Sequence, residues 1–187
     1  MVSIASLCSL VWMGWLPISN GCNRNRIDRD ELFITLPAME ASSFEDIQAE
    51  FMRRVSQAVY CNMATVDRKG RPRSRMLHPV WDGPIGWVIS WKETLKTKHL
   101  QNNPYVSLAY IYDRDKPVYV DCRAEWVDEE SEKLRFWELH KSIPEPLGFD
   151  PEPHYGTIQH PYYGLLKFTP WRVELGNLWG EPVVWRP

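Results

Sequence analysis

Apolar positions change their spacing along the chain, from helical to alternating, shortly after residue 59. From Phe44 to Val59 they recur every three or four residues, which predicts an amphipathic helix. Ser43 and Asp46 have the spacing of a capping box at its start. From Tyr60 onward the period is two, as in half-buried strands. The alternation predicts six strands, at 60–66, 73–80, 85–90, 105–112, 118–127 and 163–175.

Turn and cap residues separate these strands. Residues 67–70, Asp-Arg-Lys-Gly, predict a tight hairpin turn. Two more helices are expected, one at 94–102 and one that is capped by Asp128 and runs to about residue 141. Residues 142–161 are rich in Pro, Gly and His and predict a long loop. Antiparallel strands joined by short turns, with helices between some of them, indicate a mainly β fold, a β-barrel with flanking helices.

The first 40 residues differ from the rest, since residues 1–18 are mostly apolar and nearly free of charge. A signal peptide would carry early basic residues, but the first one is Arg24. A lipoprotein signal ending at Cys22 is a poor match, and a membrane helix would be interrupted by Gly and Pro. We favour an N-terminal extension, 1–40, outside the native fold, with translation starting at Met39 and one domain at 41–187. Lipoprotein or membrane anchoring stays open as the alternative.

Length and charge fit a single ordinary domain. The 187 residues carry a net charge of -2, which gives no general attraction to nucleic acid or anionic membranes, so neither is expected as a partner. The four cysteines form no CxxC pair, and Cys61 and Cys122 fall within predicted strands, which favours a cytoplasmic location. The ten tryptophans indicate packed strands, a subunit interface or a ring-stacking pocket.

Arginines alternate in the segment Arg71-Pro72-Arg73-Ser74-Arg75. In a strand, residues two apart share a face, so the three guanidiniums would line up, and guanidinium suits phosphate through paired hydrogen bonds. A solvated hairpin edge explains Arg71 and Arg73 equally well. Arg75 lies beside Met76 and Leu77, where an unpaired charge is costly, so for Arg75 we favour a ligand.

A second basic cluster, Ser90 to Lys98, marks the passage from a strand to a helix. Free amides at a helix start, together with the Thr94 hydroxyl and the Lys96 ammonium, form a cradle for phosphate. Thr94 is also an ordinary N-cap, and the lysines also fit a solvated helix face. Because adjoining strands can bring this cluster beside Arg75, the two clusters together predict one anion site.

Other chemistry finds little support in the sequence. The five histidines lack metal-binding spacing, so no metal site is expected. Neither a glycine-rich nucleotide loop nor a nucleophile elbow is present. His78 and Trp91 are candidates for lining a pocket, but no side chain is identified as catalytic.

A resemblance to the pyridoxamine 5′-phosphate oxidase-like, FMN-binding split-barrel family rests on four stretches of sequence. They are ATVDRKGRPRSRMLHPVWDG, GWVISWKETLKTKHLQNNPYVSLAY, VYVDCRAEWVDEESEK and the closing LLKFTPWRVEL. Together they span about residues 44–175. The resemblance implies a six-stranded antiparallel split barrel that usually forms a homodimer, with a flavin in each of two clefts between the subunits.

The resemblance also implies where a flavin would bind. Its ring and ribityl chain would lie against two strand segments, and its phosphate would lie at the helix start. Leu95 stands where the family has the arginine of a Ser-Arg-Lys step, so one phosphate donor is missing, and Lys98 or Arg73 is expected to substitute. The cofactor-binding residues implied in this way are Arg73, Arg75, Met76, Leu77, Ile89, Ser90, Thr94, Leu95 and Lys96.

The function implied by the resemblance is an FMN-dependent oxidoreductase that exchanges hydride with a small, unidentified substrate. The oxidase's C-terminal Arg-x-His motif is not found in the closing WGEPVVWRP, so oxidation of vitamin B6 is not expected. Two alternatives stay open on the same fold: an F420-dependent reductase, and a non-catalytic protein that binds flavin or haem. A barrel that binds nucleic acid through its arginines is disfavoured by the acidic net charge.

Overall fold

A computed structural model describes residues 38–187 of the chain. The interpretations of residues 1–37 as a signal, an anchor or an extension lie outside the described residues. Within the described range, no helix is both long and apolar enough to cross a membrane.

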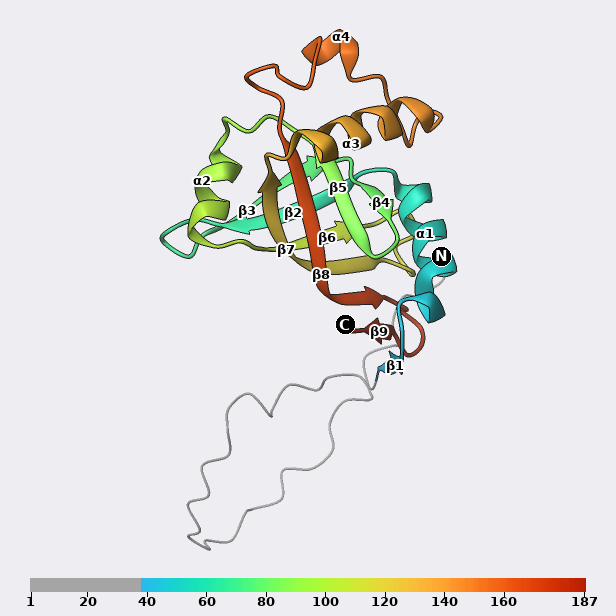
Figure 1. The fold of residues 1–187 in the computed structure, drawn as a ribbon. Coiled ribbons are helices and arrows are strands. Elements are labelled where there is room, and N and C mark those ends of the chain that lie inside the picture. Colours follow the sequence, from blue (N-terminus) through green and yellow to red (C-terminus); the bar gives the residue numbers. More distant parts are fainter. Residues whose placement is uncertain (1–37) are drawn as a thin grey trace, which may run out of the picture. The chain divides into compact units, whose positions relative to one another are not determined.

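The described part contains nine strands and four helices (Figure 1). In chain order they are β1 (Met39–Ala41), α1 (Glu45–Ala58), β2 (Cys61–Val66), β3 (Pro72–Leu77), β4 (Val80–Asp82), β5 (Ile85–Ile89), α2 (Leu95–Asn102), β6 (Tyr105–Tyr110), β7 (Val118–Val127), α3 (Glu130–Ser142), α4 (Glu152–Tyr155), β8 (Leu165–Leu175) and β9 (Val183–Trp185). The six predicted strands and three predicted helices all have counterparts with small shifts at their ends, except that the strand predicted at 73–80 is divided between β3 and β4.

The main strands form one antiparallel sheet in the order β3-β2-β6-β7-β8, and β5 pairs with the first half of β8. These are the six strands of the predicted split barrel. No pairing joins β3 to β4 among the described strands, so the sheet is open there rather than closed into a full barrel. The fold class predicted from the sequence, a mainly β split barrel with flanking helices, is confirmed.

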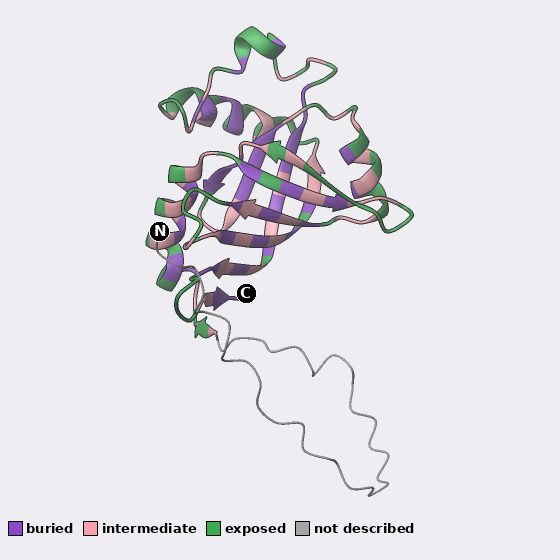
Figure 2. Ribbon diagram, turned by 180° about the vertical axis from the view of Figure 1, so that it is seen from behind, coloured by how far each residue is buried: buried purple, intermediate pink, exposed green. Residues whose placement is uncertain are grey.

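Two apolar clusters lie on opposite sides of this sheet, and both appear as buried segments in Figure 2. The main cluster fills the interior and is covered by α1, whose Phe51 packs edge-on against Trp81 with ring centres 4.9 Å apart. The second cluster lies under α3, where Phe136 stacks on Trp87 at 4.1 Å. Because side chains alternate along β5, this strand contributes to both clusters: Val88 belongs to the first and Ile89 to the second.

The predicted strand 73–80 is interrupted. The strand β3 ends at Leu77, and the chain resumes pairing as β4 from Val80. Pro79 lies between them and has no N–H to donate to a sheet ladder, so a continuous strand cannot pass through it.

Two helix starts differ from the prediction. The N–H of Ser43 donates to Asp46 Oδ2 at 2.9 Å, so the carboxylate half of the capping box forms, while Phe44 occupies the N-cap position without a side-chain bond. The prediction that Asp128 caps the next helix was wrong, because Glu129 is the N-cap of α3. The carboxylate of Asp128 instead accepts a hydrogen bond from Lys92 at 2.5 Å.

The two ends of the described chain pair with each other. The strand β9 is antiparallel to β8 and parallel to β1, with Met39 opposite Val183. The N–H of Met39 donates to the carbonyl of Pro182 at 2.9 Å. Met39 and Glu40, which the sequence-based boundary assigned to the extension, therefore belong to the sheet.

Candidate functional site

The hairpin of β2 and β3 sets the direction of Arg75. Arg75 is opposite Met63 in the antiparallel ladder, and Arg73 is opposite Thr65. Opposite residues lie on the same face of a sheet, and Met63 and Thr65 are fully buried. Arg75 therefore stands on the inner face of β3 and is half-buried.

A neutral hydroxyl, rather than a carboxylate, is the hydrogen-bond partner of the Arg75 guanidinium. Its Nη1 donates to Thr65 Oγ1 at 2.9 Å, and among residues 38–187 Arg75 forms no ion pair with a carboxylate. Burial lowers the pKa of Arg75, and the neighbouring positive charge of Arg73 lowers it further. Both effects disfavour an isolated cation at this position.

Lys96, in the first turn of α2, is a second cation that pairs with no carboxylate in the described part of the chain. Its side chain is only 5% exposed, and its Nζ donates to the carbonyl of Trp91 at 2.7 Å and to Thr94 Oγ1 at 2.9 Å. The Nζ also lies 5.6 Å from the ring centre of Trp126. Burial lowers the pKa of Lys96 to about 8, and the charge of Arg75 contributes to the decrease.

The structure therefore brings Arg75 and Lys96, 21 residues apart in sequence, to one corner between β3 and α2. Two cations with reduced contact with water and no carboxylate between them are costly, unless an anion binds to both. Thr94 is the N-cap of α2, yet its hydroxyl donates to the Trp91 carbonyl at 3.3 Å and caps no helix amide. Guanidinium, ammonium and hydroxyl groups together suit a phosphate.

Thr65 and His99 complete this corner, and the sequence analysis did not identify either of them. Thr65 Oγ1 lies 2.9 Å from His99 Nδ1 and 3.4 Å from the carbonyl of Arg73. A threonine in a strand is an ordinary β-former, so Thr65 gave no signal. His99 follows Lys96 by three residues and so lies on the same face of α2, and that spacing was a usable signal.

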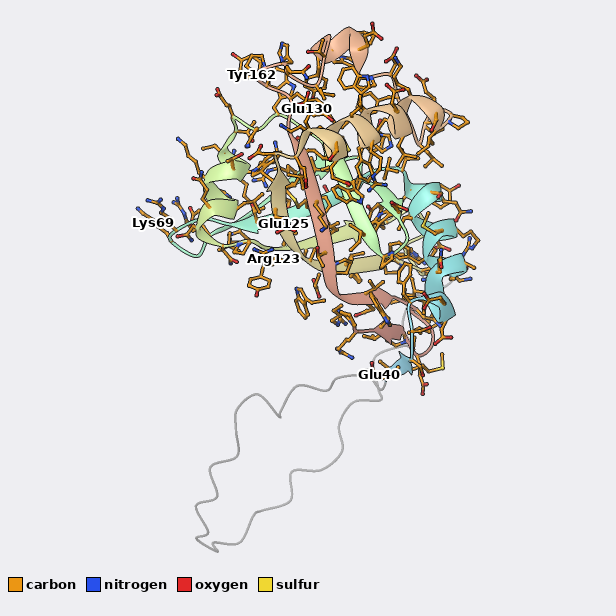
Figure 3. All side chains as sticks on the ribbon, in the orientation of Figure 1. Glu40, Lys69, Arg123, Glu125, Glu130 and Tyr162 are labelled. Carbon is orange, nitrogen blue, oxygen red and sulfur yellow. The ribbon has the colours of Figure 1, made fainter. Side chains whose placement is uncertain are left out.

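Arg71 does not join the row of arginines. It precedes β3, and its guanidinium forms an ion pair with Asp67 at 2.7 Å across the hairpin turn. The interpretation that all three guanidiniums share a strand face was therefore wrong for Arg71. Figure 3 shows Lys69 at the tip of the same hairpin, where it points away from the sheet.

Other predicted site residues of β3 lie on both of its faces. Met76 is 68% exposed on the outer face, opposite Asn62. Leu77 is half-buried and packs against the main core, and Arg73 is exposed on the inner side of the ladder. Whether these three side chains contact a cofactor stays a prediction.

The predicted site residues around the start of α2 also lie in different surroundings. Ile89 is buried in the second core cluster. The N–H of Ser90 donates to the carbonyl of Gly164 at 2.9 Å, and Leu95 is 51% exposed. Whether Ile89, Ser90 and Leu95 contact a cofactor likewise stays a prediction.

Near this corner, Gly164 packs closely against the Trp126 ring and the Ser90 backbone. A Cβ atom at position 164 would lie 2.7 Å from the Trp126 ring and 2.9 Å from the carbonyl of Ser90. Only glycine allows such an approach without moving its neighbours. The segment therefore fixes Trp126, the ring that lies under Lys96.

Two candidate pocket residues lie apart from each other. His78 packs against the rings of Tyr60 and Phe149, at 5.1 and 6.3 Å between centres. Trp91 is 57% exposed and stacks on Tyr162 at 5.4 Å, beside the carbonyl that accepts from Lys96. No group of three His, Cys, Asp or Glu side chains arranged to hold a metal ion occurs within residues 38–187.

Comparison with known proteins identifies the family. A sequence model described as pyridoxamine 5′-phosphate oxidase matches residues 47–173, more than half of the chain. The chain belongs to the pyridoxamine 5′-phosphate oxidase family. A search of curated proteins found no match.

Solved structures agree on the fold. A protein related to general stress protein 26 from Clostridium acetobutylicum is similar, with a TM-score of 0.61, 18% identity, and 76% of this chain and 95% of that chain covered. An FMN-binding protein from Nostoc punctiforme has a TM-score of 0.53, 19% identity and coverages of 77% and 89%. A haem storage protein from Vibrio cholerae has a TM-score of 0.51, 23% identity and coverages of 66% and 89%.

Proposed function

We propose that this protein binds FMN and acts as an FMN-dependent oxidoreductase on a small substrate. The observation that carries the proposal is the pair Arg75 and Lys96, two cations at one corner whose hydrogen bonds within residues 38–187 go to neutral oxygen atoms. A phosphate dianion satisfies both, because each charge-assisted hydrogen bond offsets the cost of burying its cation. Membership in the oxidase family supports a flavin as the bearer of that phosphate.

In this proposal the protein holds the cofactor and excludes water. Arg75 and Lys96 bind the phosphate, and the Thr94 hydroxyl, which accepts a hydrogen bond from Lys96, holds the ammonium in place. Arg73, whose charge already affects Arg75, takes the place of the arginine that Leu95 replaces. The flavin, when bound, supplies the hydride and electron transfer, and the residues around it supply position and electrostatics.

The proposal includes a homodimer formed through the outer face of the sheet. Exposed apolar side chains gather on this face: Met76 is 68%, Tyr105 57% and Trp171 47% exposed. Between them, the small residues Ala64, Ser107 and Ala109 let a second backbone approach closely. A flavin held at Arg75 then lies near the subunit boundary, since β3 is the last strand of its sheet.

The test compares FMN with riboflavin, which lacks the phosphate. Wild type, Arg75→Ala, Lys96→Ala and the control Lys69→Ala are titrated with each ligand by flavin fluorescence. Each of the first two substitutions is expected to weaken FMN about tenfold or more and to leave riboflavin unchanged, because one charge-assisted bond contributes roughly 1.5–3 kcal/mol. Lys69→Ala should bind as wild type does, since this side chain is exposed at the hairpin tip.

If Arg75→Ala and Lys96→Ala lose affinity for FMN and for riboflavin equally, the phosphate assignment is contradicted. Tighter binding of F420 than of FMN would indicate a deazaflavin reductase on the same fold, and a haem absorption band would indicate storage. With FMN bound, oxidation of reduced nicotinamide separates an oxidoreductase from a non-catalytic flavoprotein.

A further inference from the structure

Thr65 lies where β2 meets β3 and α2, and its side chain contacts both neighbouring elements. It belongs to β2, its side chain is 1% exposed, and its Oγ1 accepts from Arg75 of β3 at 2.9 Å. On the other side, the same oxygen is 2.9 Å from Nδ1 of His99 in α2. One hydroxyl therefore connects the two elements that carry the candidate anion site.

The direction of these hydrogen bonds follows from the groups involved. A guanidinium only donates, so Thr65 Oγ1 is the acceptor of the bond from Arg75. The single proton of Thr65 then goes to His99 Nδ1 at 2.9 Å rather than to the carbonyl of Arg73 at 3.4 Å. This assignment leaves neutral His99 with its proton on Nε2.

A neutral partner has a consequence that a carboxylate would not have. Asp or Glu at position 65 would orient Arg75 but would also cancel its charge and compete with an incoming anion. A hydroxyl fixes the guanidinium and leaves its full charge available. It also holds α2 against the sheet, so that Lys96, one helical turn before His99, stays near Arg75 despite their repulsion.

We propose that Thr65 and His99 are positioning residues for the phosphate of the bound cofactor, an inference that rests on the proposed function. They do not touch the phosphate. They hold Arg75 and α2 so that both cations meet one anion, and the Thr65 hydroxyl is the group through which they act.

The experiment compares Thr65→Val with Thr65→Ser. Valine keeps the branched shape and removes the hydroxyl, whereas serine keeps the hydroxyl. Thr65→Val is expected to weaken FMN about tenfold while changing riboflavin less than about twofold, and Thr65→Ser should bind FMN within about threefold of wild type. Thr157→Val, at an exposed loop threonine outside this corner, is the matched control and should bind both ligands as wild type does.

His99 gives a second pair of variants, in case Thr65→Val does not fold. In His99→Asn the amide oxygen can replace Nδ1 as the acceptor, whereas His99→Leu removes the acceptor. His99→Leu is expected to weaken FMN selectively, and His99→Asn should retain most of the affinity.

The outcomes separate this inference from the proposed function. If Arg75→Ala and Lys96→Ala lose FMN selectively while Thr65→Val and His99→Leu do not, the positioning role is wrong and the phosphate site stands. If Thr65→Val weakens FMN and riboflavin equally, or if serine fails to restore binding, the role is merely structural and the inference is overturned. If Arg75→Ala and Lys96→Ala also show no preference, the phosphate site itself is wrong.

Discussion

Cations on the outer face of β7 and β8 differ from those at the corner of β3 and α2 in what surrounds them. Arg172 donates to Asp121 at 3.2 Å and also pairs with Glu174, its neighbour along β8. Lys96 is 5% exposed and Arg75 is half-buried, yet within residues 38–187 they contact a hydroxyl or a backbone carbonyl and no carboxylate. The outer face neutralises its charges internally, and the corner does not.

This difference separates charges that are paired within the fold from charges that, in the proposed function, bind the phosphate of a ligand. Removing one member of a partly buried ion pair leaves the other charge without a partner, so the substitution lowers the stability of the folded protein. An uncompensated cation has the opposite effect, since the folded protein bears the cost of desolvating it. The sign of the change in stability therefore distinguishes the two regions, and the following substitutions test it.

The largest expected effect is at Arg172. The variant Arg172→Met leaves the carboxylates of Asp121 and Glu174, which are about one-fifth exposed, without their cation. We expect the free energy of unfolding to fall by about 2–3 kcal/mol, measured by urea denaturation at one protein concentration.

Arg123→Ala is the control on the same face of β7. Its pair with Glu125 is much more exposed, at 53% and 38%, and Figure 3 shows both side chains on β7. Its loss should cost less than about 0.5 kcal/mol. If Arg172→Met costs no more than Arg123→Ala, the contrast between the two regions is not real.

A smaller effect of opposite sign is expected for Lys96→Met without ligand. The pKa of Lys96 is about 8 in the folded protein and ordinarily 10.5, so the charged form is disfavoured by folding at pH 7. Methionine removes the charge but also the bonds to Trp91 and Thr94. The net gain in stability should be about 1 kcal/mol, measured by urea unfolding at pH 7.

The pH dependence provides the second half of this test. Between pH 8 and 10.5 the unfolded lysine binds a proton that the folded one has lost, so wild-type stability rises relative to Lys96→Met. Saturating FMN should remove this relative rise, because bound phosphate keeps Lys96 charged. A wild-type protein that is more stable than the variant at pH 7 and shows no such rise would argue against an uncompensated cation.

The smaller of the two pH-dependent effects is expected at His140, a buried base outside the corner of β3 and α2. His140 is fully buried, its Nδ1 donates to the carbonyl of Phe136 at 2.7 Å, and its Nε2 has no partner within the described residues. Burial lowers the pKa of His140 below its ordinary 6.5, although the bond to Phe136 opposes the shift, and repulsion from His78 adds to it. The unfolded state therefore binds the proton more readily, and stability falls as the pH drops below about 6.5.

His140→Gln should flatten this acid-side loss of stability below about pH 6.5, measured by thermal unfolding across that pH range. FMN should leave the pH dependence from His140 unchanged, in contrast to that from Lys96. An identical acid-side slope in wild type and variant would show that the His140 imidazole does not contribute.

The sequence predicted the strands well where their pattern was long. The strand β7 alternates over ten residues, and its bounds, 118–127, were predicted without error. The strands β1 and β9 have three residues each and form through pairing between positions 144 apart in sequence, which no local pattern encodes. Asp128 was assigned as a cap for a local reason, and a distant lysine, Lys92, competes for its carboxylate.

The candidate site likewise combines residues that the local sequence indicates with residues that only tertiary contacts reveal. Arg75 was named because a charge beside apolar residues is costly, and Lys96 because a lysine beside hydroxyls at a helix start suits phosphate, and the family resemblance pointed to both. Thr65 was missed because its hydroxyl matters only through the hairpin register and the position of α2, both of which are tertiary. The separation of Met76 from Arg75 onto opposite faces, by contrast, follows from strand alternation alone.

The parallel pairing of β1 with β9 also has a mechanical consequence. A pull on the start of β1 and on the end of β9 acts lengthwise along the two strands, because they run in the same direction. Their three residue pairs are then loaded together in shear instead of opening one after another. Near these ends of the described chain, the sheet is thus built to resist stretching rather than to unzip.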